Sequence, residues 1–307
     1  MAGATLSILV ITYNRPKDTL ELLQTLQSQN EIDKYLGEIL LLNNNSTESY
    51  KEVEDFINNT PELKVNYIHH FENLGVARGR NYLIPLAKHP ILVTLDDDFL
   101  LPDQNSLKKI AHFFDRPEYQ KENTGAITFN VFYTENNQRQ ITAFPHKNVN
   151  KYQDKEWFFT YYFIGCANVI KKEVFEKTGL YPEDFFYGME EYDLSYRIIE
   201  AGYTLGYDHS VIGMHKESPL GRVPHNDKIA MLWYNKSKVA WRYLPNKYYY
   251  STAIMWSLQY LLKTKMDLKG FFKTWKKVTR IPKVVIPQKI GNKAMEYLKS
   301  VEARLWY

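Results

Sequence analysis

The first 95 residues alternate between apolar runs of strand length and helical segments, and this alternation limits the possible folds more than any other feature. Between the runs, apolar residues recur at helical spacing, as Leu20, Leu23 and Leu26 do. Strands separated by helices are typical of an open, mostly parallel sheet flanked by helices. The sequence therefore predicts an α/β fold. The runs span residues 6–12, 38–44, 64–70 and 90–95.

Local signals predict where several helices begin and end. Ser46 and Thr47 are expected to cap a helix that follows the second strand. Pro85 is expected to bend or end the helix of residues 76–87. Beyond residue 100, the patterns predict a helix over 107–114, a strand over 124–134, a strand pair or buried connector over 158–170, and a helix over 189–202.

Polar residues follow three of the predicted strands: Thr12–Arg15, Asn43–Ser46 and Asp96–Asp98. Ligands of open parallel sheets bind beyond the carboxyl ends of the strands, so these segments should share one rim. Three adjacent carboxylates repel one another, and their burial without a partner is costly. A metal ion, an arginine or the start of a helix would relieve that cost.

A second acidic cluster and a histidine complete a candidate site. Mg²⁺ and Mn²⁺ bind carboxylate oxygens, and Mn²⁺ also accepts an imidazole, so Asp96–Asp98 with His215 predict a metal site for a diphosphate. On a helix, the three side chains of the second cluster cannot all point in the same direction. Asp193 is expected to pair with Arg197, which leaves Glu191 facing the cleft as a candidate general base. The second cluster comprises Glu190, Glu191 and Asp193.

The net charge of +4 hides an asymmetry between two regions. Residues 228–307 carry 14 lysines and three arginines against three acidic residues, whereas residues 1–227 have a net charge of −10. A basic, aromatic, mainly helical tail suits an anionic membrane surface, and a solvated tail is the alternative. No nucleic-acid partner is expected, because no recognition motif accompanies the charge. We therefore divide the chain into 1–227 and 228–307.

The sequence also predicts the compartment. The single cysteine, Cys166, excludes an internal disulfide and a cysteine-based zinc site, which favours a reducing cytosol. The apolar run 6–11 lacks a basic leader, and residues 248–262 fall short of the ~20 apolar residues that span a bilayer. We expect a cytoplasmic protein, peripheral at the inner face of the cell membrane.

Five motifs together resemble the glycosyltransferase family 2 enzymes of the GT-A fold over residues 5–220. They are "ILVITYNRP", "LLLNNNST", "NLGVARGRN", "TLDDDF" and "MEEYDLSYRIIEAGY" with a later histidine. The last motif is most similar to bacterial rhamnosyl-, galactosyl- and galactofuranosyltransferases of surface polysaccharide assembly. The resemblance implies that 1–227 is a GT-A domain. It also implies a hexosyl- or deoxyhexosyltransferase. Such an enzyme transfers the sugar of a dTDP- or UDP-sugar to a hydroxyl of a glycan or lipid-linked glycan, with inversion at the anomeric carbon.

The resemblance further implies roles for individual residues. Asp98 and His215 would hold Mn²⁺ or Mg²⁺, Asp96 or Asp97 would contact the ribose or donor sugar, and Glu191 would deprotonate the acceptor hydroxyl. The remaining donor-binding residues would be Thr12, Tyr13, Arg15, Asn43 and Arg80. The acceptor would contact Gly165, Cys166, Glu190 and Tyr192. Apart from the resemblance, the aromatic residues near Glu191 suit either stacking on a sugar or raising the pKa of its carboxyl by desolvation; they are Phe185, Phe186, Tyr187 and Tyr192.

Two positions depart from the family's pattern. Asn43 stands where an aspartate usually accepts the N3–H of uracil; an amide oxygen accepts the same bond without charge assistance. Glu191 stands where the base is usually aspartate, which lengthens its reach by about an ångström.

Two alternative functions remain open on the sequence alone. A sugar-nucleotide nucleotidyltransferase also combines a parallel sheet with acids and Mg²⁺, but a glycine-rich phosphate loop is expected after its first strand, where this chain has "TYNRPKD". A catalytically inactive sugar- or membrane-binding module would not need Asp98, Glu191 and His215 together.

Overall fold

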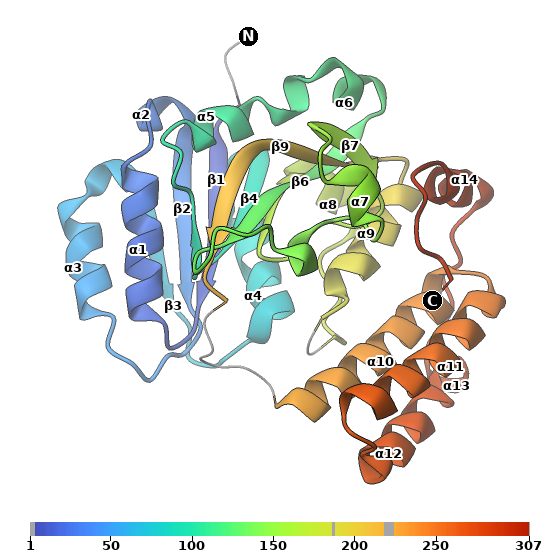
Figure 1. Ribbon diagram of the computed structural model, residues 1–307. Helices are drawn as coiled ribbons and strands as arrows, with labels where there is room; N and C mark the ends of the chain where they lie inside the picture. Colours follow the sequence, from blue (N-terminus) through green and yellow to red (C-terminus); the bar gives the residue numbers. More distant parts are fainter. Residues whose placement is uncertain (1–3, 186–187, 218–223, 307) are drawn as a thin grey trace.

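A single mixed β-sheet forms the centre of the molecule (Figure 1). The computed structural model describes residues 4–185, 188–217 and 224–306; Phe186 and Tyr187 lie outside these ranges. Within them the strand order is β3-β2-β1-β4-β8-β6-β9-β5, with β7 paired to β9. The strands are β1 (Leu6–Thr12), β2 (Leu36–Asn43), β3 (Val65–His69), β4 (Ile91–Asp96), β5 (Phe99–Leu100), β6 (Thr124–Tyr133), β7 (Trp157–Thr160), β8 (Ala167–Lys171) and β9 (Thr204–His215).

The predicted α/β fold is confirmed, and the predicted parallel arrangement describes one half of the sheet. β1 pairs in parallel with β2 and β4, and β2 with β3. In the other half β8 runs antiparallel to both β4 and β6, while β6 and β9 are parallel. Almost every residue of β1 and β2 is buried, so helices cover both faces there, as the continuous apolar runs predict.

The helices of the first two thirds of the chain surround this sheet (Figure 1). The helix ending before Pro85 is confirmed: α4 stops at Leu83, and a 3₁₀ turn (Ile84–Leu86) contains the proline. The helices are α1 (Pro16–Gln27), α2 (Ile32–Tyr35), α3 (Lys51–Asn59), α4 (Gly75–Leu83), α5 (Ser106–Ala111), α6 (Pro117–Lys121), α7 (Val149–Tyr152), α8 (Lys172–Thr178) and α9 (Glu190–Glu200).

The predicted cap of the helix after the second strand is wrong. α3 begins at Lys51, beyond Ser46 and Thr47. The amide of Ser46 donates to Asn43 Oδ1 at 3.0 Å, and the amide of Thr47 donates to Asn14 Oδ1 at 2.8 Å. These residues therefore tie the ends of β1 and β2 together instead of capping a helix.

Strand β9, which carries His215, was not predicted from sequence patterns. Its pairing with the two-residue strand β5 places Phe99 opposite His215. A Cβ at Gly213 would lie 1.8 Å from the Phe99 ring, so only glycine lets the two strands approach this closely. The pairing returns His215 to the chain segment that holds Asp98.

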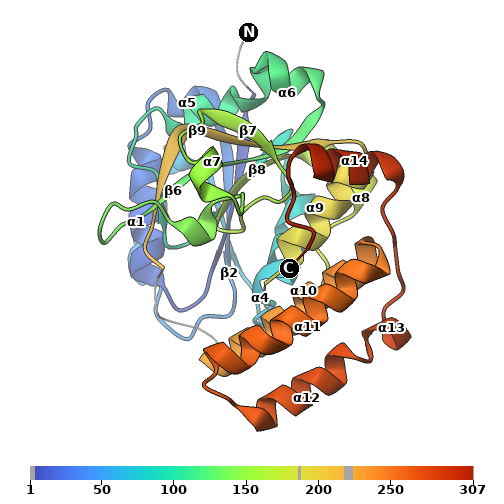
Figure 2. The same ribbon diagram turned by 45° about the vertical axis from the view of Figure 1, so that its right-hand side comes forward.

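The basic C-terminal region is helical, as predicted. Figures 1 and 2 show α10 to α13 grouped at one end of the molecule, with α14 returning beside α9. Trp233 and Tyr260 belong to a separate apolar core there, whereas Tyr243 and Leu298 join the main core under the sheet. No helix among the described residues is long and apolar enough to cross a membrane. The helices are α10 (His225–Tyr243), α11 (Asn246–Lys263), α12 (Leu268–Val278), α13 (Ile281–Val284) and α14 (Asn292–Ser300).

Candidate active site

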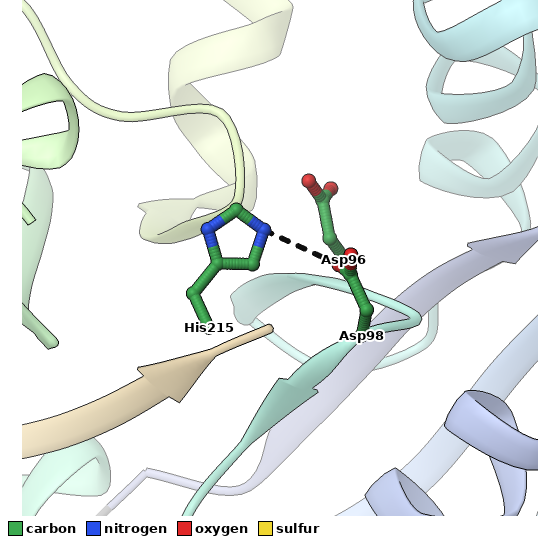
Figure 3. A group of neighbouring side chains, drawn as sticks. All are labelled: Asp96, Asp98 and His215. Atoms are coloured by element: carbon green, nitrogen blue, oxygen red, sulfur yellow. Dashed lines mark ion pairs between the residues drawn. The ribbon is translucent and has the colours of Figure 1, made fainter. Parts of the chain in front are cut away.

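Three ligand-type side chains meet at the carboxyl end of the sheet (Figure 3). Asp96 ends β4, Asp98 lies in the turn before β5, and His215 ends β9. One ligand atom from each lies within 4.8 Å of the others, and His215 Nε2 is 3.2 Å from Asp98 Oδ1. Two carboxylate oxygens and one imidazole nitrogen are a donor set that fits Mn²⁺, or Mg²⁺ with fewer protein ligands.

The cluster is held by a surrounding layer of polar contacts. Arg15 Nη1 lies 3.0 Å from Asp97 Oδ1 and 3.3 Å from Asp98 Oδ2. His215 Nδ1 is 2.9 Å from Gln140 Oε1, which fixes the plane of the imidazole ring. Arginine is therefore one of the positive groups that the adjacent acids require. Gln140 has no motif around it and could not have been found from the sequence.

The charged groups of the cluster shift one another's pKa values. Burial raises the pKa of Asp97 to about 7, although Arg15 opposes this shift. Burial lowers the pKa of His215, but its hydrogen bonds to Asp98 and Cys166 have the larger combined effect and raise the pKa to about 11. Without a metal ion, an imidazolium thus supplies the positive charge beside Asp98.

Arg80 connects this cluster to the second acidic cluster. Its guanidinium is almost fully buried, with Nη2 3.5 Å from Asp96 Oδ1 and Nη1 3.5 Å from Glu191 Oε1. Nη2 also donates to the carbonyl of Gly165 at 2.9 Å. A Cβ on Gly165 would lie 2.1 Å from Glu191 Oε1, so this glycine makes room for the carboxylate. The two acidic clusters therefore share one side of the molecule.

The start of α9 sets the direction of Glu191. Gly188 and Met189, directly before the helix, both have left-handed backbone angles (φ 69° and 78°). For methionine this conformation is strained, and such strain concentrates at functional sites. The predicted pair of Asp193 with Arg197 is confirmed at 3.0 Å, so this acid braces the helix and Glu191 points into the cleft.

Two clefts meet at these residues. The strand-end cleft, about 960 Å³, is lined by Tyr13, Arg15 and the three adjacent aspartates. The helical cleft, about 760 Å³, is lined by Glu191, Gly165 and residues of α10 and α11. Both clefts are lined by Arg80, Asp96 and His215. The arrangement suits two substrates that react where the clefts join.

The residues predicted to bind the donor divide into two groups. Tyr13, Arg15, Arg80, Asp96 and Asp97 line the strand-end cleft. Thr12 and Asn43 are buried behind it: Thr12 Oγ1 is 2.6 Å from Tyr50 Oη, and Asn43 Nδ2 donates to Tyr67 Oη at 2.7 Å. A donor-binding role for Thr12 and Asn43 stays a prediction.

The residues predicted to contact the acceptor all line the helical cleft: Gly165, Cys166, Glu190 and Tyr192. Burial and the adjacent Glu191 raise the pKa of Glu190. Tyr192 stacks on Tyr162 with the ring centroids 4.3 Å apart. The carbonyl of Cys166 accepts the amide of Asp96 at 2.9 Å, which links the wall of this cleft to the metal cluster.

Residues 7–179 match the model of glycosyl transferase family 2, and because the match covers more than half of the chain, the protein belongs to this family. An uncharacterized protein of Haemophilus influenzae is 33% identical over 184 residues, which are 58% of this chain and 92% of that relative. Family and fold together define a glycosyltransferase.

Three solved structures share the fold. The Pyrobaculum calidifontis mannosyltransferase PcManGT, in complex with GDP-Man and Mn²⁺, is 18% identical (TM-score 0.59; 98% of this chain, 80% of that one). S. aureus TarS 1-349 in complex with UDP-GlcNAc is 12% identical (TM-score 0.62; 98% and 89%). GalNAc-T7 with UDP, GalNAc and Mn²⁺ is 16% identical (TM-score 0.64; 99% and 58%).

Proposed function

We propose that this glycosyltransferase uses a divalent metal to transfer a hexosyl or deoxyhexosyl group from a dTDP- or UDP-sugar, with inversion. The acceptor is a hydroxyl of a glycan or lipid-linked glycan in polysaccharide biosynthesis. One observation carries the proposal: the Asp96, Asp98 and His215 cluster and the Glu191 carboxylate lie on either side of Arg80, where the two clefts join. Two of the similar structures contain Mn²⁺ and a nucleotide or nucleotide sugar.

Each substrate has a cleft suited to it. The strand-end cleft takes the nucleoside diphosphate, with Asp98 and His215, joined by Asp96, as metal ligands. Arg15 and Tyr13 line the path of the nucleotide. Mn²⁺ or Mg²⁺ would neutralise charge that grows on the leaving diphosphate. The helical cleft takes the acceptor.

The protein's own groups perform the proton transfer. Glu191 removes the proton from the acceptor hydroxyl as its oxygen attacks the anomeric carbon and the bond to the diphosphate breaks. Arg80 holds the Glu191 carboxylate by a charged contact at 3.5 Å and positions it relative to Asp96. Gly165 keeps the carboxylate free of steric contact. Gly165, Cys166, Glu190 and Tyr192 form the wall against which the acceptor binds.

A thermal-shift screen of nucleoside diphosphates with and without Mn²⁺ tests the donor site. UDP or dTDP should raise the melting temperature more than GDP or ADP, and only with the metal present, because Asp98 would hold a metal that neutralises the diphosphate. An equal shift without metal would contradict the metal role. Equal shifts for all four nucleotides would contradict the base preference.

We further propose that α11 and α12 dock on an anionic membrane at the inner face of the cell membrane. Tyr250, Ile254, Leu258 and Leu262 recur every four residues, so they lie on one side of α11, and all are at least half exposed. Leu268 and Phe272 continue the exposed apolar surface on α12. Apolar side chains among lysines are typical of interfacial helices. The neighbouring exposed lysines are Lys263, Lys265, Lys269, Lys273, Lys276 and Lys277.

Co-sedimentation with phosphatidylglycerol liposomes tests this surface. Replacing Leu258 and Leu262 by glutamate should weaken binding at least about tenfold, since each leucine that enters the interface contributes on the order of 1.5–3 kcal/mol. Leu86→Glu, an exposed leucine outside the region, is the matched control. Equal sedimentation of all three proteins would contradict membrane docking.

A further inference from the structure

The end of the helical cleft that lies away from the metal cluster is lined by positive charge. Asp96, Glu217 and Lys228 line both clefts and so lie where the clefts join. Four further basic residues line the helical cleft alone. They come from four separate segments of the chain, so the fold gathers them at one place. These residues are Lys147 before α7, Lys236 on α10, Lys263 at the end of α11, and Arg304 after α14.

Lys236 is at the centre of this group, which we call the basic cluster. Its Nζ lies 4.7 Å from the centre of the Trp256 ring, and Lys263 Nζ lies 5.7 Å from the same ring. Burial, followed by the charges of Lys147, Arg304 and Lys263, lowers the pKa of Lys236 to about 7. Gathering these cations is unfavourable until an anion joins them.

A second lysine on the same helix shows how the protein neutralises a buried ammonium group. Lys238 is buried two residues further along α10, and its Nζ pairs with Asp184 Oδ2 at 2.5 Å. Within the described ranges, no carboxylate lies at ion-pair distance from Lys236, Lys147 or Lys263. The described residues therefore supply a counter-charge for Lys238 but none for Lys236, Lys147 and Lys263.

The basic cluster is connected to the candidate base. Lys147 Nζ lies 5.1 Å from the centre of the Tyr162 ring, and Tyr162 stacks on Tyr192, the residue after Glu191. A ligand held by these cations would therefore lie along the Tyr162 and Tyr192 rings, in the direction of Glu191. Apolar side chains line the same end of the cleft: Leu232, Val239, Leu244, Trp256, Leu305 and Trp306.

We infer that the acceptor carries a phosphate or diphosphate, which Lys236 and Lys147 bind while its hydroxyl lies at Glu191. This inference rests on the proposed function, because it concerns the acceptor of that reaction. Phosphate oxygens accept strong charge-assisted hydrogen bonds from lysine and arginine. The phosphate belongs either to a lipid carrier, whose chain would follow the apolar lining, or to a soluble sugar phosphate.

Isothermal titration with geranyl diphosphate in EDTA tests the site without metal bridging at Asp98. Lys236→Met should weaken binding about tenfold, the effect of losing one charged hydrogen bond. Lys147→Met, which changes an exposed side chain and therefore leaves folding intact, should do the same. The matched control is Lys293→Met, an exposed lysine of α14 outside the cleft, which should bind as the wild type does.

A second readout separates a phosphate site from a merely structural lysine. Because the pKa of Lys236 lies near 7, phosphate binding at pH 8 should take up a proton, and the heat measured should change with the ionisation enthalpy of the buffer. That change should disappear in Lys236→Met. Equal affinities for the wild type, Lys236→Met and Lys147→Met, or no binding by the wild type, would overturn the inference.

Two further ligands identify the source of the phosphate. Tighter binding of geranyl diphosphate than of glycerol 3-phosphate, with no binding of geraniol, supports a lipid carrier. Equal binding of the two phosphates supports a soluble sugar phosphate. Phosphate binding that depends on Lys236, in a protein whose stability no nucleoside diphosphate changes, would contradict the proposed function and leave this site standing.

Discussion

The two clefts that join at Arg80 balance their charges in different ways. In the strand-end cleft, the Asp97 and Asp98 carboxylates have Arg15 and His215 within 3.3 Å. In the helical cleft, Lys236 lies near other cations and against the Trp256 ring, and no described carboxylate pairs with it. The acids of the strand-end cleft are thus already paired with positive groups of the protein. A metal ion that binds there would take over part of this pairing. The helical cleft is suited to an anion that arrives with the substrate.

This contrast separates the two substrates by chemistry. A nucleoside diphosphate is itself an anion, so in the proposed mechanism a metal ion would offset its repulsion by the acidic residues. The proposed acceptor phosphate would need no metal, because lysines would face it directly. Arg80 and Glu191 lie between the two environments. Substitutions should therefore impair one cleft, the other, or only the step at their junction.

The largest effect is expected from Asp98→Asn, which breaks the metal side alone. Loss of this ligand should lower transfer on the order of ten-thousandfold, since a metal contributes several kcal/mol to transition-state stabilisation. Titration of UDP with and without Mn²⁺ should show that metal-dependent affinity is lost. Geranyl diphosphate binding in EDTA should persist. Unchanged Mn²⁺-dependent affinity for UDP would show that Asp98 is not a metal ligand.

Glu191→Gln acts at the junction and should spare binding on both sides. The amide keeps the size of the side chain but accepts no proton, so turnover should fall about a thousandfold. Affinities for UDP with Mn²⁺ and for geranyl diphosphate should stay within twofold of the wild type. A variant that retains turnover would remove Glu191 as the base.

Gly165→Ala tests whether the position of Glu191, and not only its charge, matters. The new Cβ would lie 2.1 Å from Glu191 Oε1, so the carboxylate must shift. A displacement of about an ångström is expected to lower kcat about a hundredfold, with a smaller change in KM for the donor. Gly291→Ala, at a helix start remote from both clefts, is the control. Equal kcat for the two variants would contradict the positioning role.

Local sequence patterns indicate part of the candidate site, and contacts between distant segments bring in the rest. The alternation of strands and helices and the run Asp96–Asp98 are local patterns, and parallel strands place their carboxyl ends on one rim. Glu191 was proposed as the base from the helical periodicity around it. By contrast, the return of His215 depends on pairing between β9 and β5, and Gln140 is brought close only by the folded chain.

The basic cluster shows the same limit more clearly. The excess of lysine after residue 228 is visible in the composition, but it does not distinguish Lys236, which is inside the cleft, from Lys269, which is on the surface. Their difference depends on how α10 and α11 pack and on where Lys147 and Arg304 end up. Contacts between segments so far apart in sequence leave no local periodicity.

The smallest expected effect concerns stability and again separates the two clefts. The pKa of Lys236 is lower in the folded state than its ordinary 10.5, so between pH 7 and pH 10 the unfolded chain binds the additional proton and stability rises with pH. The charged groups that face Lys236 are Lys147, Arg304 and Lys263, and each disfavours its ammonium form. Lys236→Met should therefore melt a few degrees higher than the wild type at pH 6.5, and the difference should shrink toward pH 10.

Geranyl diphosphate supplies the missing counter-charge and should reduce this difference. At pH 6.5 it should raise the melting temperature of the wild type more than that of Lys236→Met, because only the wild type gains a neutralised ammonium group. Lys293→Met provides the baseline, since its side chain is exposed on α14. A difference between the wild type and Lys236→Met that is the same at pH 6.5 and pH 10 would mean that Lys236 is already neutralised by the protein, and the contrast between the two clefts would fail.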